Sequence, residues 1–466
     1  MTKKSFIRSL RRGLGGAIVA LQNNPEREEY REIVMRYCFR NIAYDPQCEG
    51  TKGYYLYLAI KTFDRREEFL TRIAEKFSET LNHHLAGQLY DILCCFADDG
   101  YALADEAIEK KYADLKRRLP LMDEYDLWYC EREQLEKLMI RKMERGGFRA
   151  LKRCIDDMGE MIINCGCDDC IWYDEIMFEA EERFGKKADA YIASANNEKA
   201  AAFRQARGQW EAQKNEGGRL NLKAVSADAF AKSYRPEQSG EQEEKVTLEQ
   251  LIARAKELEA DGAGYPFRIR SVIHEFLKQA DEEELKALAR AALAESSGFV
   301  KAALLRTFTF ADFPLDMEML FPYTYSDGEW LREAAVQALS RTGGKRLREL
   351  IVPLFEAGYA EDALTLMVSD FAIEDETAIR KYILCSKRIE HGMLGSIRDI
   401  YEKNESSTCG DILLHFYRNA ECTLCRKGIV EMMIQHEVIP RRILEECQYD
   451  SYRKTRELAR KALAGK

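Results

Sequence analysis

The segment Leu331-Arg332-Glu333-Ala334-Ala335-Val336-Gln337-Ala338-Leu339 decides the fold of this chain. Apolar or small side chains fall at positions i, i+3, i+4, i+7 and i+8 of the segment, which form one face of an α-helix. The same pattern recurs through the second half of the chain, with starts at residues 269, 300, 331, 360, 389, 425 and 455. The spacing of 29 to 36 residues between starts predicts a stacked structural repeat.

A second helical pattern lies between many of these helices. It covers residues 281–293, 345–355, 375–384 and 443–447. Each repeat is therefore predicted to be a helix–turn–helix unit, in which small residues such as Ala334 and Ala363 let neighbouring helices approach closely. A single unit is too small to bury its own apolar face, so its stability must come from its neighbours. The predicted fold class is all-α, an α-solenoid of stacked antiparallel helix pairs.

The 331–339 segment resembles the first helix of the HEAT-like repeat family, which carries a run of the type Leu-Arg-x-x-Ala-Ala-x-x-Leu. The resemblance is clearest over residues 265–466. Two repeats depart from the family pattern, because Glu361 and Glu390 stand where a basic residue follows the first apolar position. The resemblance implies a right-handed solenoid whose concave face, lined by the second helices, grips a partner.

The first half of the chain also reads as helical, with less regular spacing. Two apolar segments that begin at Gly53 and Gly87 are offset by 34 residues, which is again the size of a repeat. We therefore expect a divergent helical-repeat block over residues 1–214. Its predicted helix pairs are 53–63 with 67–77, 87–96 with 101–115, and 135–143 with 148–163.

Residues 215–246 are the best candidate for a flexible linker. The stretch contains Gly217, Gly218 and Pro236 and a polar run over residues 237–244, all of which disfavour regular structure. Thr247 and Gln250 follow as a capping box, the signature of a helix N-terminus. The expected organisation is a divergent block over 1–214, the linker over 215–246, and a HEAT-like repeat block over 247–466.

Composition supports helix and limits the classes of function. Only 9 of the 466 residues are proline, where average usage would give roughly 23. A hydrophobic fraction of 46% excludes wholesale disorder. The net charge of −9 disfavours nucleic acid as a partner, because proteins that neutralise phosphates show a positive excess.

The same composition gives an expectation for the cellular compartment. No apolar stretch has the length of a membrane span, and residues 1–21 lack the apolar core and cleavage site of a secretory signal. The 14 cysteines lie largely among apolar residues, where a thiol behaves as a small hydrophobe. We therefore expect a cytoplasmic protein with reduced cysteines and no membrane contact.

The sharpest chemical motif is Cys165-Gly166-Cys167-Asp168-Asp169-Cys170. Three thiols within six residues can ligate zinc, because thiolates bind soft metals. A closed zinc site needs a fourth ligand, and only Cys130 and Cys154 lie upstream as candidates. The alternative is a cysteine-rich helix junction without metal, and the missing fourth ligand favours that alternative.

Cys422-Thr423-Leu424-Cys425 has the two-residue spacing of metal and redox motifs. It opens a repeat helix in which Cys425 falls on the apolar face, so a structural role is favoured over metal or redox chemistry. His415, His436 and Cys409 complete a site there only if the fold happens to bring them close. The six histidines show no metal-ligand spacing, and no phosphate loop, nucleophile elbow or kinase signature is present.

These observations predict no enzyme, no cofactor and no catalytic residue. The expected function is a non-catalytic scaffold or adaptor that binds a protein partner on the concave face of the solenoid. The alternative is a nucleic-acid-binding or DNA-modifying protein, because some HEAT-like repeat proteins are DNA glycosylases. Trp172-Tyr173-Asp174 and the basic C-terminal end offer residue types for that alternative, but no matching motif. The oligomeric state is left open.

Overall fold

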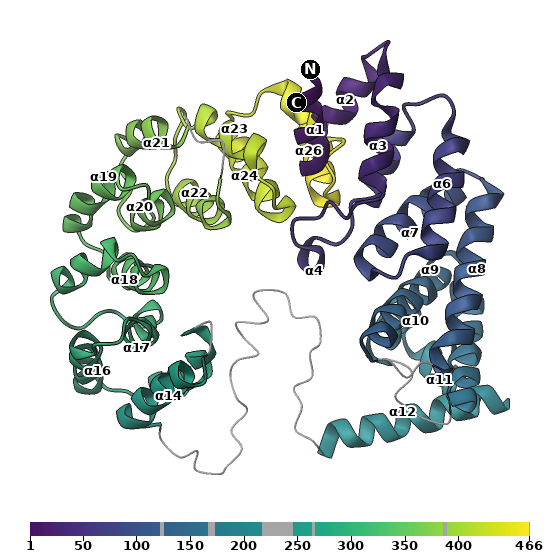
Figure 1. Cartoon of the computed structure of the whole chain (residues 1–466), viewed down its shortest axis with the longest axis horizontal. Coiled ribbons are helices and arrows are strands. Elements are labelled where there is room, and N and C mark those ends of the chain that lie inside the picture. Colours follow the sequence, from purple (N-terminus) through teal and green to yellow (C-terminus); the bar gives the residue numbers. More distant parts are fainter. Residues whose placement is uncertain (122–124, 166–172, 217–245, 263–265, 385–388, 466) are drawn as a thin grey trace. The chain divides into compact units, whose positions relative to one another are not determined.

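The computed structural model describes residues 1–121, 125–165, 173–216, 246–262, 266–384 and 389–465. Helix is the sole regular secondary structure in these ranges, which confirms the all-α prediction (Figure 1). None of the helices in the same ranges is long and apolar enough to cross a membrane. The predicted linker falls almost wholly on residues 217–245, which lie outside the described ranges.

The chain divides into two compact units, each with its own packing. Unit 1 is Met1–Tyr234 together with Glu445–Arg460, and unit 2 is Arg235–Leu444 together with Lys461–Lys466. The sequence analysis places residues 445–460 in the C-terminal block, whereas their contacts join them to unit 1. Helical periodicity reports which face of a helix is buried, and it carries no information about the distant segment that buries it.

Unit 1 is built from short amphipathic helices followed by longer ones. Its elements are α1 (Lys3–Arg12), α2 (Gly16–Gln22), α3 (Arg31–Cys38), α4 (Pro46–Glu49), α5 (Gly53–Ile60), α6 (Arg66–Glu79), α7 (His83–Asp98), α8 (Ala102–Arg118), α9 (Tyr125–Cys165), α10 (Tyr173–Phe184), α11 (Lys186–Ser194) and α12 (Glu198–Glu216). The first two predicted pairs correspond to α5 with α6 and α7 with α8. The third lies on α9, which is two helical segments joined at the non-helical Gly147.

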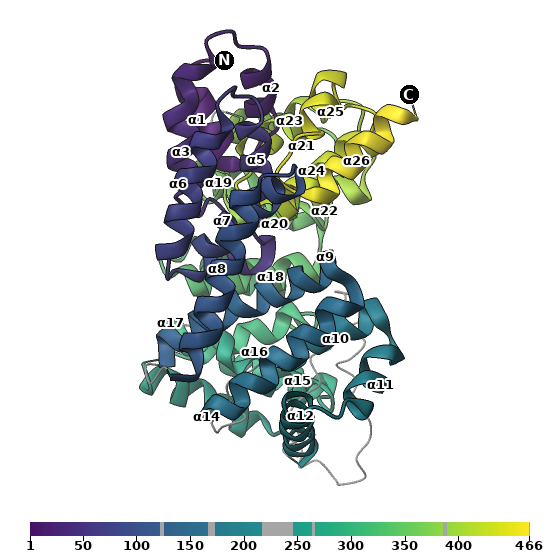
Figure 2. The same ribbon diagram turned by 90° about the vertical axis from the view of Figure 1, so that its right-hand side faces the viewer.

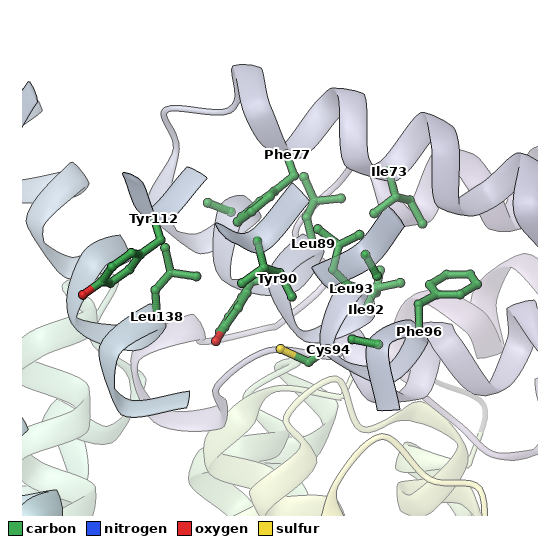
Figure 3. Close-up of a cluster of buried hydrophobic side chains, with 14 of the residues drawn as sticks. Ile73, Phe77, Leu89, Tyr90, Ile92, Leu93, Cys94, Phe96, Tyr112 and Leu138 are labelled. Atoms are coloured by element: carbon green, nitrogen blue, oxygen red, sulfur yellow. The ribbon is translucent and has the colours of Figure 1, made fainter. Parts of the chain in front are cut away.

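The core of unit 1 runs between α5, α6, α7 and α8, which pack against one another (Figure 2). Helix α7 is buried over much of its circumference, with Leu89, Ile92 and Phe96 fully enclosed. Figure 3 shows these side chains gathered with Ile73 and Phe77 of α6. A helix that is apolar nearly all round needs neighbours on several sides, and α5, α6 and α8 provide them.

The C-terminal segment of unit 1 packs on its first helices at very close range. The Ser451 backbone N–H donates to the Gly13 carbonyl at 2.9 Å. A Cβ atom at Gly15 would lie 1.7 Å from the Glu446 carbonyl oxygen, so only glycine allows this approach. The Arg456 guanidinium lies 4.5 Å from the ring centre of Tyr54 in α5. These contacts involve α25 (Arg441–Cys447) and α26 (Arg453–Ala464).

Unit 2 consists of short helices of similar length. They are α14 (Leu248–Ala260), α15 (Arg270–Leu277), α16 (Glu282–Ala294), α17 (Gly298–Leu305), α18 (Glu329–Thr342), α19 (Arg348–Glu356), α20 (Ala360–Met367), α21 (Asp375–Ile383), α22 (His391–Lys403), α23 (Gly410–Asn419) and α24 (Thr423–Gln435). The seven predicted repeat helices correspond to α15, α17, α18, α20, α22, α24 and α26. The starts of α17, α18, α20 and α22, at residues 298, 329, 360 and 391, are 31 residues apart.

The helices of unit 2 form two layers (Figure 1). The inner layer is α17, α18, α20, α22 and α24, and each of these helices packs on the next. The outer layer is α16, α19, α21 and α23. Because α19 packs against the following α20, and α23 against the following α24, an outer-layer helix precedes its inner-layer partner. This order is the reverse of the expected one, because helical periodicity does not identify the partner of a helix.

Polar contacts between neighbouring inner-layer helices recur about one repeat apart. Arg332 donates to Asp362, 30 residues later, at 2.8 Å. The hydroxyls of Thr365 and Ser396, 31 residues apart, lie 3.3 Å from each other. At the helix starts, Thr247 and Gln250 form the predicted capping box. The sequence analysis did not identify α23, or the 3-10 helix Met317–Tyr325, which contains Pro322.

Candidate binding pockets and a histidine–cysteine cluster

Two adjoining pockets lie on unit 1 beside α7 and α9. Pocket A has a volume of about 530 Å³ and pocket B about 400 Å³. They share Tyr90, Cys94 and Arg141 in their walls, so we call them the paired pockets. The loop before α5 lines one side of pocket A, and α8 lines one side of pocket B.

Helix α7 places its polar side chains on the pocket side. Tyr90 and Cys94 are one turn apart and face the pockets, while Leu89 and Leu93 face the core. The Tyr90 ring stacks on Phe77, with 6.2 Å between ring centres, and Figure 3 shows its hydroxyl pointing away from that ring. Asp91 accepts a hydrogen bond from the Thr51 hydroxyl in pocket A. Burial raises the pKa of Asp91 above its usual value.

Ion pairs between α7, α8 and α9 line the paired pockets. Arg141 donates to Asp98 at 3.0 Å and to Glu144 at 2.9 Å. Arg145 donates to Asp105 at 2.6 Å, and Lys142 pairs with Glu109. The walls carry five acidic and five basic side chains: Asp91, Asp105, Glu109, Glu144 and Asp157 against Lys137, Arg141, Lys142, Arg145 and Arg153. The pocket walls therefore carry no net excess of either sign.

Three pocket cysteines are poor nucleophiles. Burial raises the pKa of Cys94 to about 11, that of Cys95 to about 12, and that of Cys154 to about 12. A thiol with such a pKa is protonated at neutral pH, and the thiolate is the reactive form. The pockets thus have the character of a binding surface rather than of a thiol active site.

The predicted Cys165, Cys167 and Cys170 motif lies mostly outside the described residues. Cys165 is the last residue of α9, and Cys167 and Cys170 lie outside the described ranges. Of the two candidate fourth ligands, Cys154 is 1% exposed, and its thiol donates to the Met139 carbonyl at 3.8 Å. Cys154 therefore belongs to the core of unit 1, and a zinc site at this motif stays a prediction.

A histidine and two cysteines meet in unit 2 at the starts of two inner-layer helices. The side-chain ligand atoms of His391, Cys422 and Cys425 all lie within 4.8 Å of one another. The Cys425 thiol is 3.7 Å from Nε2 of His391 and 3.9 Å from Nδ1. We call these three residues the histidine–cysteine cluster.

The sequence analysis identified the two cysteines of this cluster but not its histidine. His391 precedes Cys422 by one repeat, so the 31-residue spacing of the inner-layer helices is the signal that would have found it. His436, which the sequence offered instead, hydrogen bonds through Nε2 to the Tyr401 carbonyl at 2.8 Å. The thiol of Cys409 donates to the Ser406 carbonyl at 3.4 Å.

Comparison with known proteins finds no family model that matches this chain and no curated protein of matching sequence.

Proposed function

We propose that this chain is a non-catalytic scaffold or adaptor that binds a protein partner. The paired pockets of unit 1 are the proposed binding surface. Their shared wall at Tyr90, Cys94 and Arg141 joins the two pockets into one elongated surface beside α7, on which an extended peptide segment can lie. The single observation that carries the proposal is the equal number of acidic and basic side chains in their walls.

Charge balance separates a protein partner from a nucleic acid. A phosphate backbone presents one negative charge per nucleotide and selects surfaces with a cationic excess. In the paired pockets each of Arg141, Lys142 and Arg145 already faces a carboxylate. A peptide with both acidic and basic residues can form ion pairs with both members of each wall pair. A polyanion, in contrast, is repelled by the carboxylates in the walls. A protein partner is therefore favoured over the nucleic-acid alternative.

We further propose that the helices of unit 2 form a HEAT-like α-solenoid. The 31-residue spacing of four inner-layer helices supports this proposal, as does the packing of each inner-layer helix on the next. The side-chain contacts one repeat apart, such as Arg332 with Asp362, support it as well. Such stacks typically bind partners through extended surfaces. We place the protein in the cytoplasm, where buried thiols such as Cys38 stay reduced.

A charge reversal in pocket A tests the binding proposal. Lys137 is exposed in the wall of pocket A, so Lys137→Glu changes the local charge without disturbing the core. Lys187→Glu makes the same change on α11, away from the paired pockets. We expect cross-linking in host cells to recover a protein partner with the wild-type chain and with Lys187→Glu, but at least about tenfold less of it with Lys137→Glu.

Two results would contradict this proposal. Equal recovery of the partner by both variants would remove the paired pockets as the binding surface. Loss of the partner after nuclease treatment, together with direct binding of duplex or single-stranded DNA that weakens steeply with salt, would replace the protein partner with a nucleic acid.

A further inference from the structure

The two cysteines of the histidine–cysteine cluster are arranged by the start of α24. Cys422 is the N-cap residue, and its sulfur accepts a hydrogen bond from the Cys425 backbone N–H at 3.5 Å. Residues three apart in the first turn of a helix lie on the same side. The Cys-x-x-Cys spacing therefore places both sulfur atoms on the side of α24 that faces His391.

The third group comes from the neighbouring inner-layer helix. His391 is the first residue of α22, and α22 packs directly on α24. In a tetrahedral zinc site, Zn–S bonds of about 2.3 Å and Zn–N bonds of about 2.0 Å separate sulfur from nitrogen by about 3.5 Å. The observed separations of 3.7 Å and 3.9 Å between the Cys425 sulfur and the two ring nitrogens of His391 are close to this value.

We propose that His391, Cys422 and Cys425 bind one zinc ion. Two sulfurs and one imidazole nitrogen form a donor set that suits zinc and disfavours magnesium and calcium, which prefer oxygen. On binding, both thiols release their protons to solvent, so that two thiolates neutralise the charge of Zn²⁺. The three ligands found among the described residues leave one tetrahedral position for a fourth ligand.

The cluster can be reached from solvent on the side of His391 and Cys425. Cys422 is 5% exposed and forms the floor, whereas His391 is exposed and Cys425 is partly exposed. An acidic and a basic side chain lie near the site: Glu361 beside His391 and Arg398 beside Cys425. The Glu361 carboxylate lies against the first turn of α22, where a Cβ atom at Gly392 would come within 1.9 Å of its Oε1. The zinc ion would tie the start of α22 to the start of α24.

The experiment must separate this cluster from the Cys165, Cys167 and Cys170 motif. The full chain is purified without added metal and without chelator, and its zinc content is measured by elemental analysis. The purified chain is then stripped of metal and titrated with Co²⁺, whose thiolate charge-transfer absorption reports cysteine ligation. The variants are Cys425→Ser, His391→Ala and, as the matched control, the triple substitution Cys165→Ser, Cys167→Ser and Cys170→Ser.

We expect the wild-type chain and the triple-substituted control to share a Co²⁺ absorption that Cys425→Ser abolishes. We expect His391→Ala to weaken Co²⁺ binding at least about tenfold, since it removes one of three ligands. Cys425 and His391 are less buried than Cys422, and circular dichroism checks that both variants are folded. Three results would overturn the proposal: no thiolate absorption, absorption that only the triple substitution removes, or recovery of a Cys422–Cys425 disulfide from protein purified under reducing conditions.

Discussion

The guanidinium of Arg332 donates a hydrogen bond of 2.8 Å to the Asp362 carboxylate and so joins α18 to α20. Both side chains are 15% exposed, and Arg332 also lies 4.0 Å from the ring centre of Tyr359. Burial raises the pKa of Asp362, and Arg332 opposes that rise. Arg332→Ala would leave a largely buried carboxylate without its partner, and we expect it to destabilise unit 2 by about 3 kcal/mol.

A double-mutant cycle with Asp362→Ala measures this interaction. Hydrogen exchange in α18 and α20 gives the local free energy of opening for each variant. Because removing both charges leaves none unpaired, we expect the double variant to lose less stability than the sum of the single variants. Additive losses would mean that the two groups contribute independently of each other.

Ala335 provides a direct test of helix packing in unit 2. Its side chain is fully buried on α18, which packs on both α17 and α20. Ala335→Asp would bury a charge between these helices, at a cost of several kcal/mol, and we expect cooperative loss of unit 2 on thermal unfolding. Gln337→Asp adds the same charge at an exposed position of the same helix and should leave the unfolding transition nearly unchanged. Similar transitions for both variants would exclude close packing at Ala335.

Gly15 tests the attachment of the C-terminal segment to unit 1. A methyl group at this position would collide with the Glu446 carbonyl, so the two segments would have to separate. We expect Gly15→Ala to cost about 1 to 3 kcal/mol and to speed hydrogen exchange over residues 445–460. Gly208→Ala in α12 is the matched control, because no atom lies within 4 Å of the added methyl group. The control should be neutral or slightly stabilising, since alanine favours helix over glycine.

Asp91 predicts a specific pH dependence of stability. Burial raises its folded-state pKa above the ordinary value of 3.8, and Glu144 raises it further. The Thr51 hydroxyl, Arg141 and Lys137 lower the pKa and so offset part of this rise. The folded chain therefore holds this proton more tightly than the unfolded chain, and the associated stability is lost as the pH rises through the folded-state pKa.

Asp91→Asn should remove this loss. We expect the variant to be more stable than the wild-type chain at pH 7 and equally stable well below pH 3.8, where Asp91 is protonated in both the folded and the unfolded chain. Thr51→Val removes the hydroxyl that stabilises the carboxylate, so it should lower stability at pH 7. Urea unfolding across this pH range checks both variants, and a constant difference at every pH would contradict the assignment.

Much of the helical structure of unit 2 could be predicted from the sequence, because the signal is local. Positions such as Ala334, Ala335 and Leu339 each report burial through their spacing within one helix, and all three are buried. The order of helices within a pair could not be predicted, because the apolar spacing of α18 is the same whichever neighbouring helix packs on it. The contacts of residues 445–460 with Gly13 and Gly15 could not be predicted either, because these residues lie more than 400 positions apart in the sequence.

The candidate sites were harder to predict than the fold. Cys422 and Cys425 are visible as a motif, but His391 joins them only because α22 and α24 lie side by side. The paired pockets have no sequence signature, because Asp91, Arg141 and Arg145 are ordinary charged helix residues until α7, α8 and α9 bring them together. Chemistry shared between neighbouring helices requires the tertiary arrangement.

The packing of residues 445–460 on the first helices has a consequence for biosynthesis. Unit 1 draws its last part from a segment that the ribosome makes only after all of residues 235–444. The surface around Gly15 and Tyr54 therefore stays uncovered until residues 445–460 have been made, and unit 1 cannot be completed before then. Although domains generally fold in order from the N-terminus, unit 1 becomes complete only after the segment that forms most of unit 2 has been made.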